Sequence, residues 1–420
     1  MAESFQLILR IIAPLLSLWW LWLPVLLGYI LITNYQKLKK KEYLASLKWV
    51  TLQVYFPRDP HRSPKAMEAV FSALHGIYGP PKPRDARWKG KVPDWFSFEI
   101  ISNQGKIFYY IRTLESHRNF LESQIYAHYP EAEIYEVPDY VTYLPEKIPD
   151  GKFDLWGAEL ALTKEDAYPI RTYEDFEEKG AGKDDAKRID PIASLVELLS
   201  TLHTDEHIWI QYLFRPAGED WLKRSQEVID KLNGKTPKPA GRGIVMSTLS
   251  GAVDLIDGLV TPATPPTEKK EEKKPEPKPG AAEAIRAIEK SLGKLGHEVG
   301  IRMMYIAPKE SFKKAHVAGL TGAFKQFSTQ NLNGFKFDKD SVPFATKRLD
   351  KWFRKAEVEY KKKTGFFSKF KGRLFTKKPF VLSTEEFATV FHFPDVMVKS
   401  PLLPRVEAKH GEPPSNLPVN

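Results

Sequence analysis

Apolar and polar residues alternate along much of the stretch from Trp95 to Val137. This alternation predicts two β-strands joined by a turn at Ser102–Gly105, where Asn and Gly tolerate the positive φ of a hairpin. Ser116 is then expected to cap a helix that ends at Pro130, and Glu133–Val137 to form a short strand. The inward-facing positions are Phe96, Phe98, Ile100, Ile107, Tyr109, Ile111, Phe120, Leu121, Ile125 and Tyr129.

A strand and a helix are predicted before this stretch. Lys48–Phe56 has apolar residues at every second position, and a helix opens at Ser63 with Pro64 in its first turn, where a missing N–H costs little. Together the elements have the order βαββαβ. That order is typical of the ferredoxin-like fold, a four-stranded antiparallel sheet with both helices on one face. The predicted fold class is therefore α+β.

The same order of elements recurs further along the chain, which predicts an internal duplication at the level of fold. The second set interrupts its two middle strands with an insertion, residues 216–297. A Pro/Lys/Glu tract at 261–280 has no apolar side chains to bury and is predicted to be disordered, and the helices that flank it are expected to pair as an arm. The elements of the second set are Leu155–Leu162, a helix from Asp190, His207–Phe214, Val299–Ile306, Ser311–Phe327 and Gly334–Asp338, with insertion helices at Trp221–Leu232 and Ala281–Leu295.

The segment Phe5–Thr33 is apolar apart from Arg10. As one helix it would span roughly 44 Å, against about 30 Å for the hydrocarbon core of a bilayer. A cleaved signal peptide is the rival interpretation, but the basic residues Lys37–Lys41 follow the apolar run instead of preceding it. The positive-inside rule then predicts a single-pass anchor in the inner membrane with a cytoplasmic body, and the prolines within the run leave a shallow hairpin as an alternative.

Charge separates the end of the chain from the rest. The net charge is +10, and the segment Lys347–Lys378 alone holds thirteen Lys and Arg against three acids. The chain of 420 residues contains no cysteine, which excludes disulfides and thiolate metal sites. The apolar run, the repeated order of elements and the charge distribution together divide the chain into an anchor (1–40), two ferredoxin-like modules (41–145 and 146–340), and a basic-aromatic segment with a C-terminal tail (341–420).

Within the basic segment, aromatic and cationic residues are interleaved in a pattern that suits an anionic membrane surface or a protein partner. The same cations suit the phosphates of nucleic acid, and a solvated basic face is the third interpretation. The candidate contact residues are Lys361, Lys362, Lys363, Phe366, Phe367, Lys369, Phe370, Lys371 and Arg373.

Motifs for catalysis or cofactor binding are absent from the sequence. Gly234-Lys235-Thr236 resembles the end of a P-loop, but Ile229 stands where the first glycine would be required. The histidines are scattered and favour packing or surface roles over metal ligation. Phe108 and Tyr110 are candidates for base stacking on a sheet, although the surrounding residues do not match the RNP1 pattern. We expect no enzyme activity, no cofactor and no metal.

The segment 382–394, LSTEEFATVFHFP, resembles one that stands just before the motor domain in membrane-anchored type IV secretion and conjugation ATPases of the HerA/VirD4 kind, as found in bacteria of the candidate phyla radiation. The stretch ESQIYAHYPEAEIYEV and the ending EPPSNLP resemble the same proteins. The chain ends where the motor would begin, without Walker motifs. The resemblance therefore implies a separately encoded, non-catalytic companion of such an ATPase. Candidate contacts in this segment are Glu386, Phe387, Phe391 and His392, and Ser383 with Glu386 has capping-box spacing.

These observations lead to one main hypothesis and one alternative. The main hypothesis is a membrane-anchored scaffold that docks a HerA/VirD4/VirB4-like ATPase in a translocation machine, with homo-oligomers compatible because such motors are rings. The alternative is a membrane-tethered nucleic-acid adaptor that uses Lys347–Lys378. An unrecognised enzyme is the third and weakest hypothesis.

Overall fold

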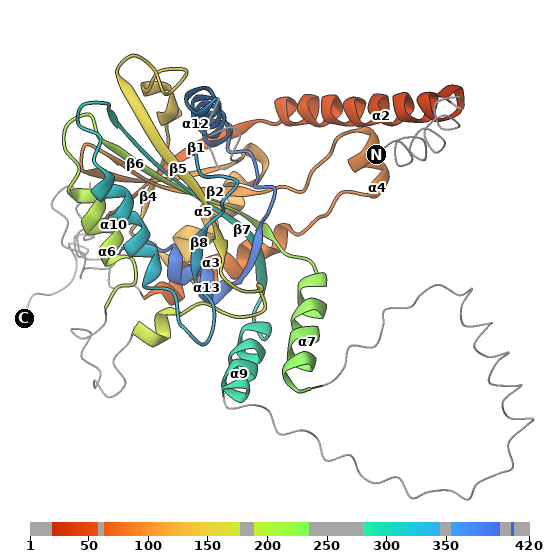
Figure 1. Ribbon diagram of the computed structural model, residues 1–420. Helices are drawn as coiled ribbons and strands as arrows, with labels where there is room; N and C mark the ends of the chain where they lie inside the picture. The colour runs from red at the N-terminus through yellow and green to blue at the C-terminus, as the bar shows by residue number, and fades with distance from the viewer. Residues whose placement is uncertain are drawn as a thin grey trace, which may run out of the picture.

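The computed structural model describes residues 19–57, 63–176, 189–234, 280–344, 354–394 and 405–406 (Figure 1). Parts of several predicted segments therefore lie outside the described residues: 5–18 of the apolar run, 261–279 of the linker, 347–353 of the basic segment and most of the tail.

In the described part of the chain, ten strands form one mixed sheet, which is antiparallel except for one short parallel pair at its edge. The main path runs β10-β1-β3-β2-β6-β7-β5-β8, with β4 also paired to β1 and β9 to β7. The strands are β1 (Trp49–Pro57), β2 (Phe96–Asn103), β3 (Lys106–Leu114), β4 (Glu133–Glu136), β5 (Phe153–Leu162), β6 (His207–Pro216), β7 (Gly296–Pro308), β8 (Phe335–Phe337), β9 (Phe380–Ser383) and β10 (Arg405–Val406).

The sheet consists of two halves with matching strand order. From its outer edge inward, the first half has the order β4-β1-β3-β2, and the second has β8-β5-β7-β6. The halves join through β2 and β6, which pair antiparallel from Phe96 opposite Phe214 to Asn103 opposite His207. With the insertion and the short helix α4 (Pro83–Trp88) set aside, each half has the expected chain order strand, helix, strand, strand, helix, strand. One continuous sheet therefore runs through the whole body.

Five helices cover one face of the sheet, here called the inner face. Alternate side chains of the central strands point into this layer, and Phe98, Ile210 and Met303 are fully buried there. The helices are α3 (Pro64–Leu74), α5 (Arg118–His128), α6 (Ala193–Ser200), α10 (Lys314–Lys325) and α13 (Thr384–Val390).

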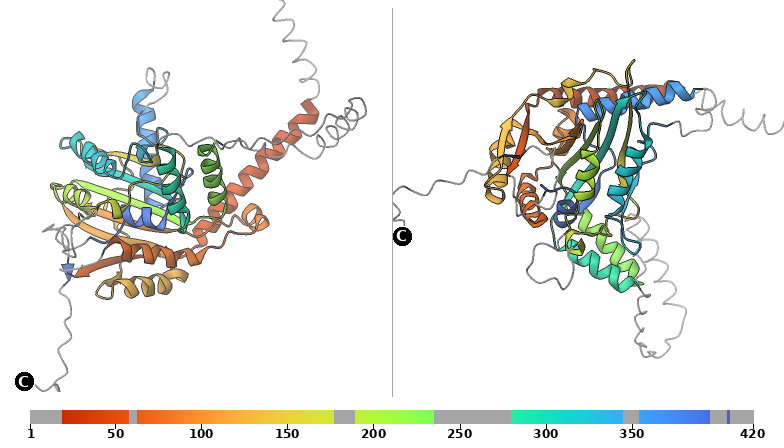
Figure 2. Two further views of the ribbon diagram at one scale, coloured as in Figure 1. Left: turned by 90° about the horizontal axis from the view of Figure 1, so that it is seen from below. Right: turned by 90° about the vertical axis from the view of Figure 1, so that its left-hand side faces the viewer.

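The opposite, outer face is covered by different segments. Helix α12 (Lys355–Lys371) and the short helix η3 (Tyr140–Tyr143) pack on it, and a second apolar cluster forms between them and the sheet. The body therefore has three layers: the helices of the inner face, the sheet, and α12 with η3 on the outer face (Figure 2).

Local signals at the helix ends and turns were partly right. Ser63 accepts a hydrogen bond from the Lys65 backbone N–H at the start of α3, as predicted. The prediction of Ser116 as a cap is wrong, because Ser116 lies in a short 3-10 turn and α5 begins at Arg118 without a side-chain cap. In the β2–β3 turn, Gln104 and Gly105 adopt positive φ angles of 55° and 82°.

The insertion begins and ends with paired helices. α7 (Asp220–Leu232) and α9 (Ala281–Leu292) lie side by side below the body, as predicted (Figure 1). Val228 and Ile229 of α7 pack with Ile288 of α9 in a small apolar cluster that also includes Ala167 from the segment after β5. We call this pair the insertion arm.

Helix α2 (Trp19–Ser46) projects away from the body, with α4 (Pro83–Trp88) beside it (Figures 1 and 2). Large apolar side chains are exposed along the first half of α2, among them Val25, Tyr29 and Leu31, each more than 65 % exposed. None of the helices among the described residues is both long enough and apolar enough to cross a membrane.

Candidate functional site

A buried cluster of charged side chains joins the C-terminal segment to the outer face of the sheet. Arg373 follows α12 and is 1 % exposed, and Glu99 on β2 is completely buried. The Nε of Arg373 lies 3.0 Å from Oε1 of Glu99, and its Nη1 and Nη2 donate to Asp139 at 2.7 and 2.8 Å. Arg112 of β3 also pairs with Asp139. The cluster thus ties residue 373 to strands near the start of the body.

The Glu99 carboxyl group also accepts hydrogen bonds from two neutral side chains. Tyr140 and Gln211 donate to Glu99 at 2.7 and 2.9 Å. Burial opposes the charge of the Arg373 guanidinium, but the negative charges of Glu99 and Asp139 outweigh burial and raise the pKa of Arg373. For Asp139 the positive charge of Arg373 likewise outweighs burial and lowers the pKa. Both groups are therefore held in their charged forms.

The aromatic residues predicted as membrane or partner contacts belong to this interior. Phe366, Phe367 and Phe370 of α12 are all at most 3 % exposed and pack against Trp209 and Met304 on the outer face. The physical reason is that apolar side chains of this face, such as Trp209 and Met304, need a cover that the short helix η3 only partly supplies. This corrects the predicted contact surface, because these three rings and Arg373 lie inside the protein.

A glycine in the sheet makes room for α12. A Cβ atom at Gly157 of β5 would lie well inside van der Waals distance of the Phe366 ring. We expect Gly157→Ala to destabilise the protein by about 1–3 kcal/mol, because it overpacks this contact. Gly365→Ala on α12 is the matched control, since nothing lies within 4 Å of its added methyl group and Ala favours a helix by about 1 kcal/mol over Gly. Urea unfolding curves of the two variants should shift in opposite directions; equal shifts would contradict the close packing.

The lysines predicted as contacts differ in exposure and in the partners they bind. Lys361 and Lys369 are exposed, and Lys361 pairs with Glu357 on the same helix. Lys363 pairs with Asp154 at 2.6 Å, while the Lys362 ammonium donates to the Phe344 carbonyl at 2.8 Å. Lys371 is half-buried. Several of the cations proposed for phosphate or lipid contact are thus engaged within the protein.

The C-terminal motif also lies in the interior, on the other face of the sheet. Strand β9 pairs with β7, and α13 packs against α3 in the inner core. Phe387 and Phe391 are completely buried, and Phe387 stacks on Phe71 with ring centroids 4.0 Å apart. As a correction, neither ring of this motif is placed to contact a partner ATPase, because the body uses both to close its own core.

Polar members of the motif are bonded within the protein. The predicted capping box is confirmed: Ser383 and Glu386 exchange hydrogen bonds at the start of α13. Glu386 also accepts from the Ile170 N–H at 2.8 Å, and burial raises its pKa. Both ring nitrogens of His392 are engaged, Nδ1 with the Ala388 carbonyl and Nε2 with Asp190. Glu386 and His392 therefore support packing, and the predicted contact residues are split between opposite faces of the sheet.

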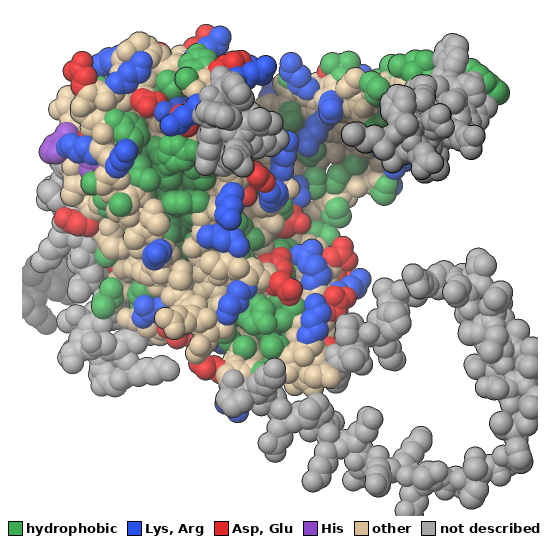
Figure 3. Space-filling model, in the orientation of Figure 1, with side chains coloured by type: hydrophobic (Ala, Val, Ile, Leu, Met, Phe, Trp, Pro, Cys, Tyr) green, Lys and Arg blue, Asp and Glu red, His purple; other side chains and the backbone are tan. Residues whose placement is uncertain are grey.

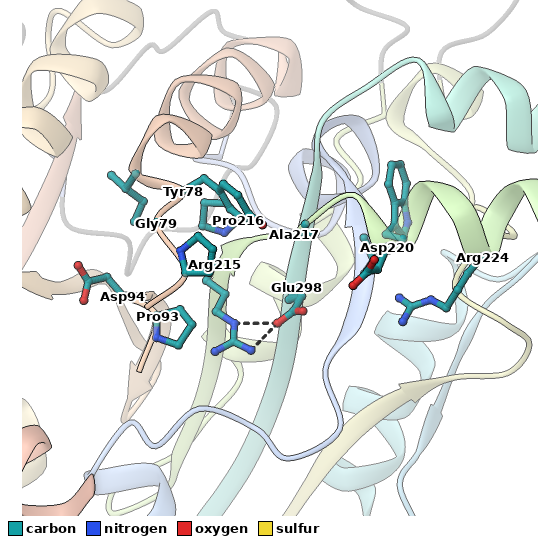
Figure 4. A pocket seen from close by; sticks show the side chains of 15 residues that line it. Tyr78, Gly79, Pro93, Asp94, Arg215, Pro216, Ala217, Asp220, Arg224 and Glu298 are labelled. Carbon is teal, nitrogen blue, oxygen red and sulfur yellow. Dashed lines mark hydrogen bonds and ion pairs between the residues drawn. The ribbon is translucent and has the colours of Figure 1, made fainter. Parts of the chain in front are cut away.

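A pocket of about 240 Å³ lies at the base of the insertion arm (Figure 4). Its walls come from the segments around Tyr78 and Asp94, the end of β6 and the first turn of α7. Arg215 and Glu298 point toward one another across neighbouring strands, with Nη2 and Oε2 2.6 Å apart. The indole of Trp221 is buried, and its N–H has no hydrogen-bond acceptor among the described residues.

The charged side chains that line this pocket are largely neutralised by neighbours, Arg215 by Glu298 and Arg224 by Asp166. No pair of side chains in the walls combines a nucleophile with a general base. In the described part of the chain, no group of three His, Cys, Asp or Glu is placed to hold a metal ion.

A buried histidine on β7 directly precedes Glu298, one of the residues that line the pocket. His297 of β7 is completely buried among Phe71, Phe214 and Phe387, and neither ring nitrogen has a hydrogen-bond partner among the described residues. Burial, and to a lesser extent His75, lowers the pKa of His297 from its ordinary 6.5 to about 3. The folded protein therefore resists protonation of this ring while the unfolded chain accepts it.

This difference predicts a loss of stability in acid. Below pH 6.5 the unfolded chain binds the extra proton, so His297 should lower the free energy of unfolding as pH falls toward 3, by roughly 1.4 kcal/mol per pH unit. His297→Phe should flatten the pH dependence of stability between pH 6 and pH 4, relative to an otherwise similar change at the exposed His203. Denaturant titrations at several pH values measure both slopes, and equal slopes would contradict an unpaired neutral ring.

The arrangement defines a mixed α+β body with a closed core and an external arm. The chain belongs to the family described as "Domain of unknown function (DUF8128)", whose model matches residues 34–402. That match begins after the apolar part of α2 and includes both faces of the sheet. No curated protein matches the chain.

Sequence reasoning missed Glu99, Asp139 and Trp221. The signal for Glu99 was a carboxylate within a strand whose neighbours are apolar, because a buried charge requires a partner. Gly157 within a strand was a second signal, since glycine in a strand often marks close approach of another segment. Nothing comparable in the sequence pointed to the pocket.

Proposed function

We propose that this protein is a membrane-anchored, non-catalytic scaffold, built from two ferredoxin-like modules joined edge to edge. The exposed apolar surface of α2 carries the proposal. Leu21, Leu27 and Leu31 point outward on a helix that is apolar around its circumference, and water is a poor solvent for such a surface. The cations Lys37 to Lys41 follow directly, as expected for the cytoplasmic end of a single-pass anchor in the inner membrane.

The interior of the body supports a structural role. Its buried carboxylates and guanidiniums, Glu99 with Arg373 and Glu159 with Arg302, neutralise one another on the outer face. The charge of Glu99 raises the pKa of Arg373, and the charge of Arg302 lowers the pKa of Glu159 against burial, so both shifts favour the charged form, whereas a general acid or base works best with a pKa near the operating pH. Rigid pairing of this kind favours a platform that holds another protein.

We propose a HerA/VirD4/VirB4-like translocation ATPase as the partner. This step rests on the likeness of the segment 382–394 to sequences next to such motors. Because that segment lies in the core, the contact with the ATPase has to come from the surface or from residues after 394. Removal of residues 395–420 is therefore a cleaner test than removal of the motif, because it spares β9 and α13 and takes from the described sheet the two-residue strand β10 alone.

The test is affinity purification of the full chain from detergent-solubilised membranes, followed by identification of bound proteins. Recovery of a motor ATPase that is lost on deletion of residues 395–420 would support the scaffold and place the contact in the tail. Recovery of nucleic acid alone, released by moderate salt, would replace the scaffold with the nucleic-acid adaptor. Extraction of the intact chain by alkaline carbonate would remove the membrane anchor from the proposal.

A further inference from the structure

The junction of α2 and α4 carries a concentrated positive charge at the base of the projecting helix. The segment 82–91 contains five Lys and Arg and one acid, and all five cations are exposed. Four further lysines lie at 37–41 on α2 with Glu42 after them, which gives the two short segments a combined net charge of +7. Figure 3 shows Lys and Arg side chains on the projecting helix α2 and its neighbour α4, between the body and the apolar outer end of α2. The five cations of the first segment are Lys82, Arg84, Arg87, Lys89 and Lys91.

The two segments are held together by specific contacts. Gly90 has φ +69°, and a Cβ atom there would collide with the backbone of Lys39 and Lys40. Only a glycine allows the loop after α4 to approach α2 so closely. The Trp88 ring lies 6.2 Å from the Tyr35 ring, and both residues remain 40 % or more exposed. The cations of α4 are thus fixed at one level along α2.

That level lies just beyond the continuous apolar run. The exposed large apolar residues of the run end at Ile32, Tyr35 lies about 4.5 Å further along the helix axis, and the exposed Leu38 follows among the lysines. Headgroup layers on each side of a bilayer are roughly 5–8 Å thick. If the hydrocarbon core ends near Thr33, Tyr35 and Trp88 lie among the headgroups, where such aromatic residues are enriched.

We propose that the α2–α4 junction is a binding site for anionic phospholipid headgroups. The inference rests on the proposed membrane anchor and adds a lipid class to it. Three observations support it: the net positive charge, the exposed tryptophan beside a tyrosine, and their position at the boundary of the apolar surface. The partner is the anionic leaflet itself, whose negative potential attracts clustered Lys and Arg.

The absence of cysteine from the chain allows a direct test. A fluorophore on Ala86→Cys would report the position of α4, and one on Leu27→Cys would report insertion of α2. Both full-length proteins are reconstituted into vesicles of phosphatidylcholine with increasing phosphatidylglycerol, using headgroup quenchers for position 86 and acyl-chain quenchers for position 27. We expect quenching at position 86 to increase with phosphatidylglycerol and to decrease with salt, because added salt screens exposed charges.

Charge reversal in α4 supplies the decisive variant. Lys82→Glu, Arg84→Glu and Arg87→Glu together should raise the phosphatidylglycerol fraction needed for half-maximal quenching by more than about fivefold, the factor expected for one cation. The matched control reverses three exposed lysines on the body, Lys106, Lys314 and Lys325, and should change nothing. Quenching at position 27 without quenching at 86 would overturn the lipid site and leave the anchor. Quenching at 86 alone would keep the lipid site and overturn the anchor, and quenching at neither would overturn both.

Discussion

Replacement of Arg373 by Met is expected to destabilise the protein by about 3–5 kcal/mol. The substitution leaves the completely buried Glu99 carboxyl group without its guanidinium partner, while Asp139 loses two hydrogen bonds. A methionine fills most of the volume, so the cost comes from the unpaired charge and not from a cavity. Urea unfolding of the full chain in mild detergent, followed by tryptophan fluorescence, measures the change in unfolding free energy.

Two further variants separate the charge from the packing. Lys377→Met removes an exposed cation nearby and should change stability by less than about 0.5 kcal/mol. Combining Arg373→Met with Glu99→Gln should cost less than the sum of the single changes, because the double variant has no uncompensated carboxylate at position 99. Strict additivity would show that Arg373 and Glu99 stabilise the fold independently.

Replacement of Phe387 by Ala should cost about 3–5 kcal/mol. Its ring is completely buried between Phe71 of α3 and Phe214 of β6, with centroid distances of 4.0 and 4.8 Å. The lost ring leaves a cavity where α13, α3 and the sheet meet. The same unfolding experiment measures this loss, and limited proteolysis should then cut the body at lower protease concentrations.

An exposed phenylalanine provides the comparison. Phe344 is 50 % exposed, and Phe344→Ala should leave stability within about 0.5 kcal/mol of the original. If Phe387→Ala were equally mild, the C-terminal motif would not be part of the cooperative core. The motif at 382–394 would then again be a candidate for contact with a partner.

The order of strands and helices could be predicted from the sequence because each element carries its own period. β1, β2, β3, β5 and β6 all begin or end within a few residues of their predicted limits, and Pro64 and the Ser383–Glu386 capping box mark helix starts by local chemistry alone. The error at Ser116 has a local cause too, since a 3-10 turn intervenes before α5.

What covers each face of the sheet could not be predicted in this way. The phenylalanines of α12 stand among lysines, and this composition also suits a membrane surface. Their burial depends on a glycine in β5 and a carboxylate in β2, more than 200 residues earlier in the chain. Contacts over such separations leave no periodic signal in a single sequence. The pocket beside Trp221 could not be predicted from the sequence for the same reason.

The position of α13 has a consequence for synthesis of the chain. Phe71 and Phe387 are separated by more than 300 residues, yet their rings stack in the core. At about 5–20 residues per second, a ribosome needs roughly 15–60 s to make the intervening chain. During that interval α3 lacks the helix that packs against it. The nascent chain therefore exposes this apolar surface of α3, which makes it a candidate substrate for chaperones until α13 leaves the ribosome.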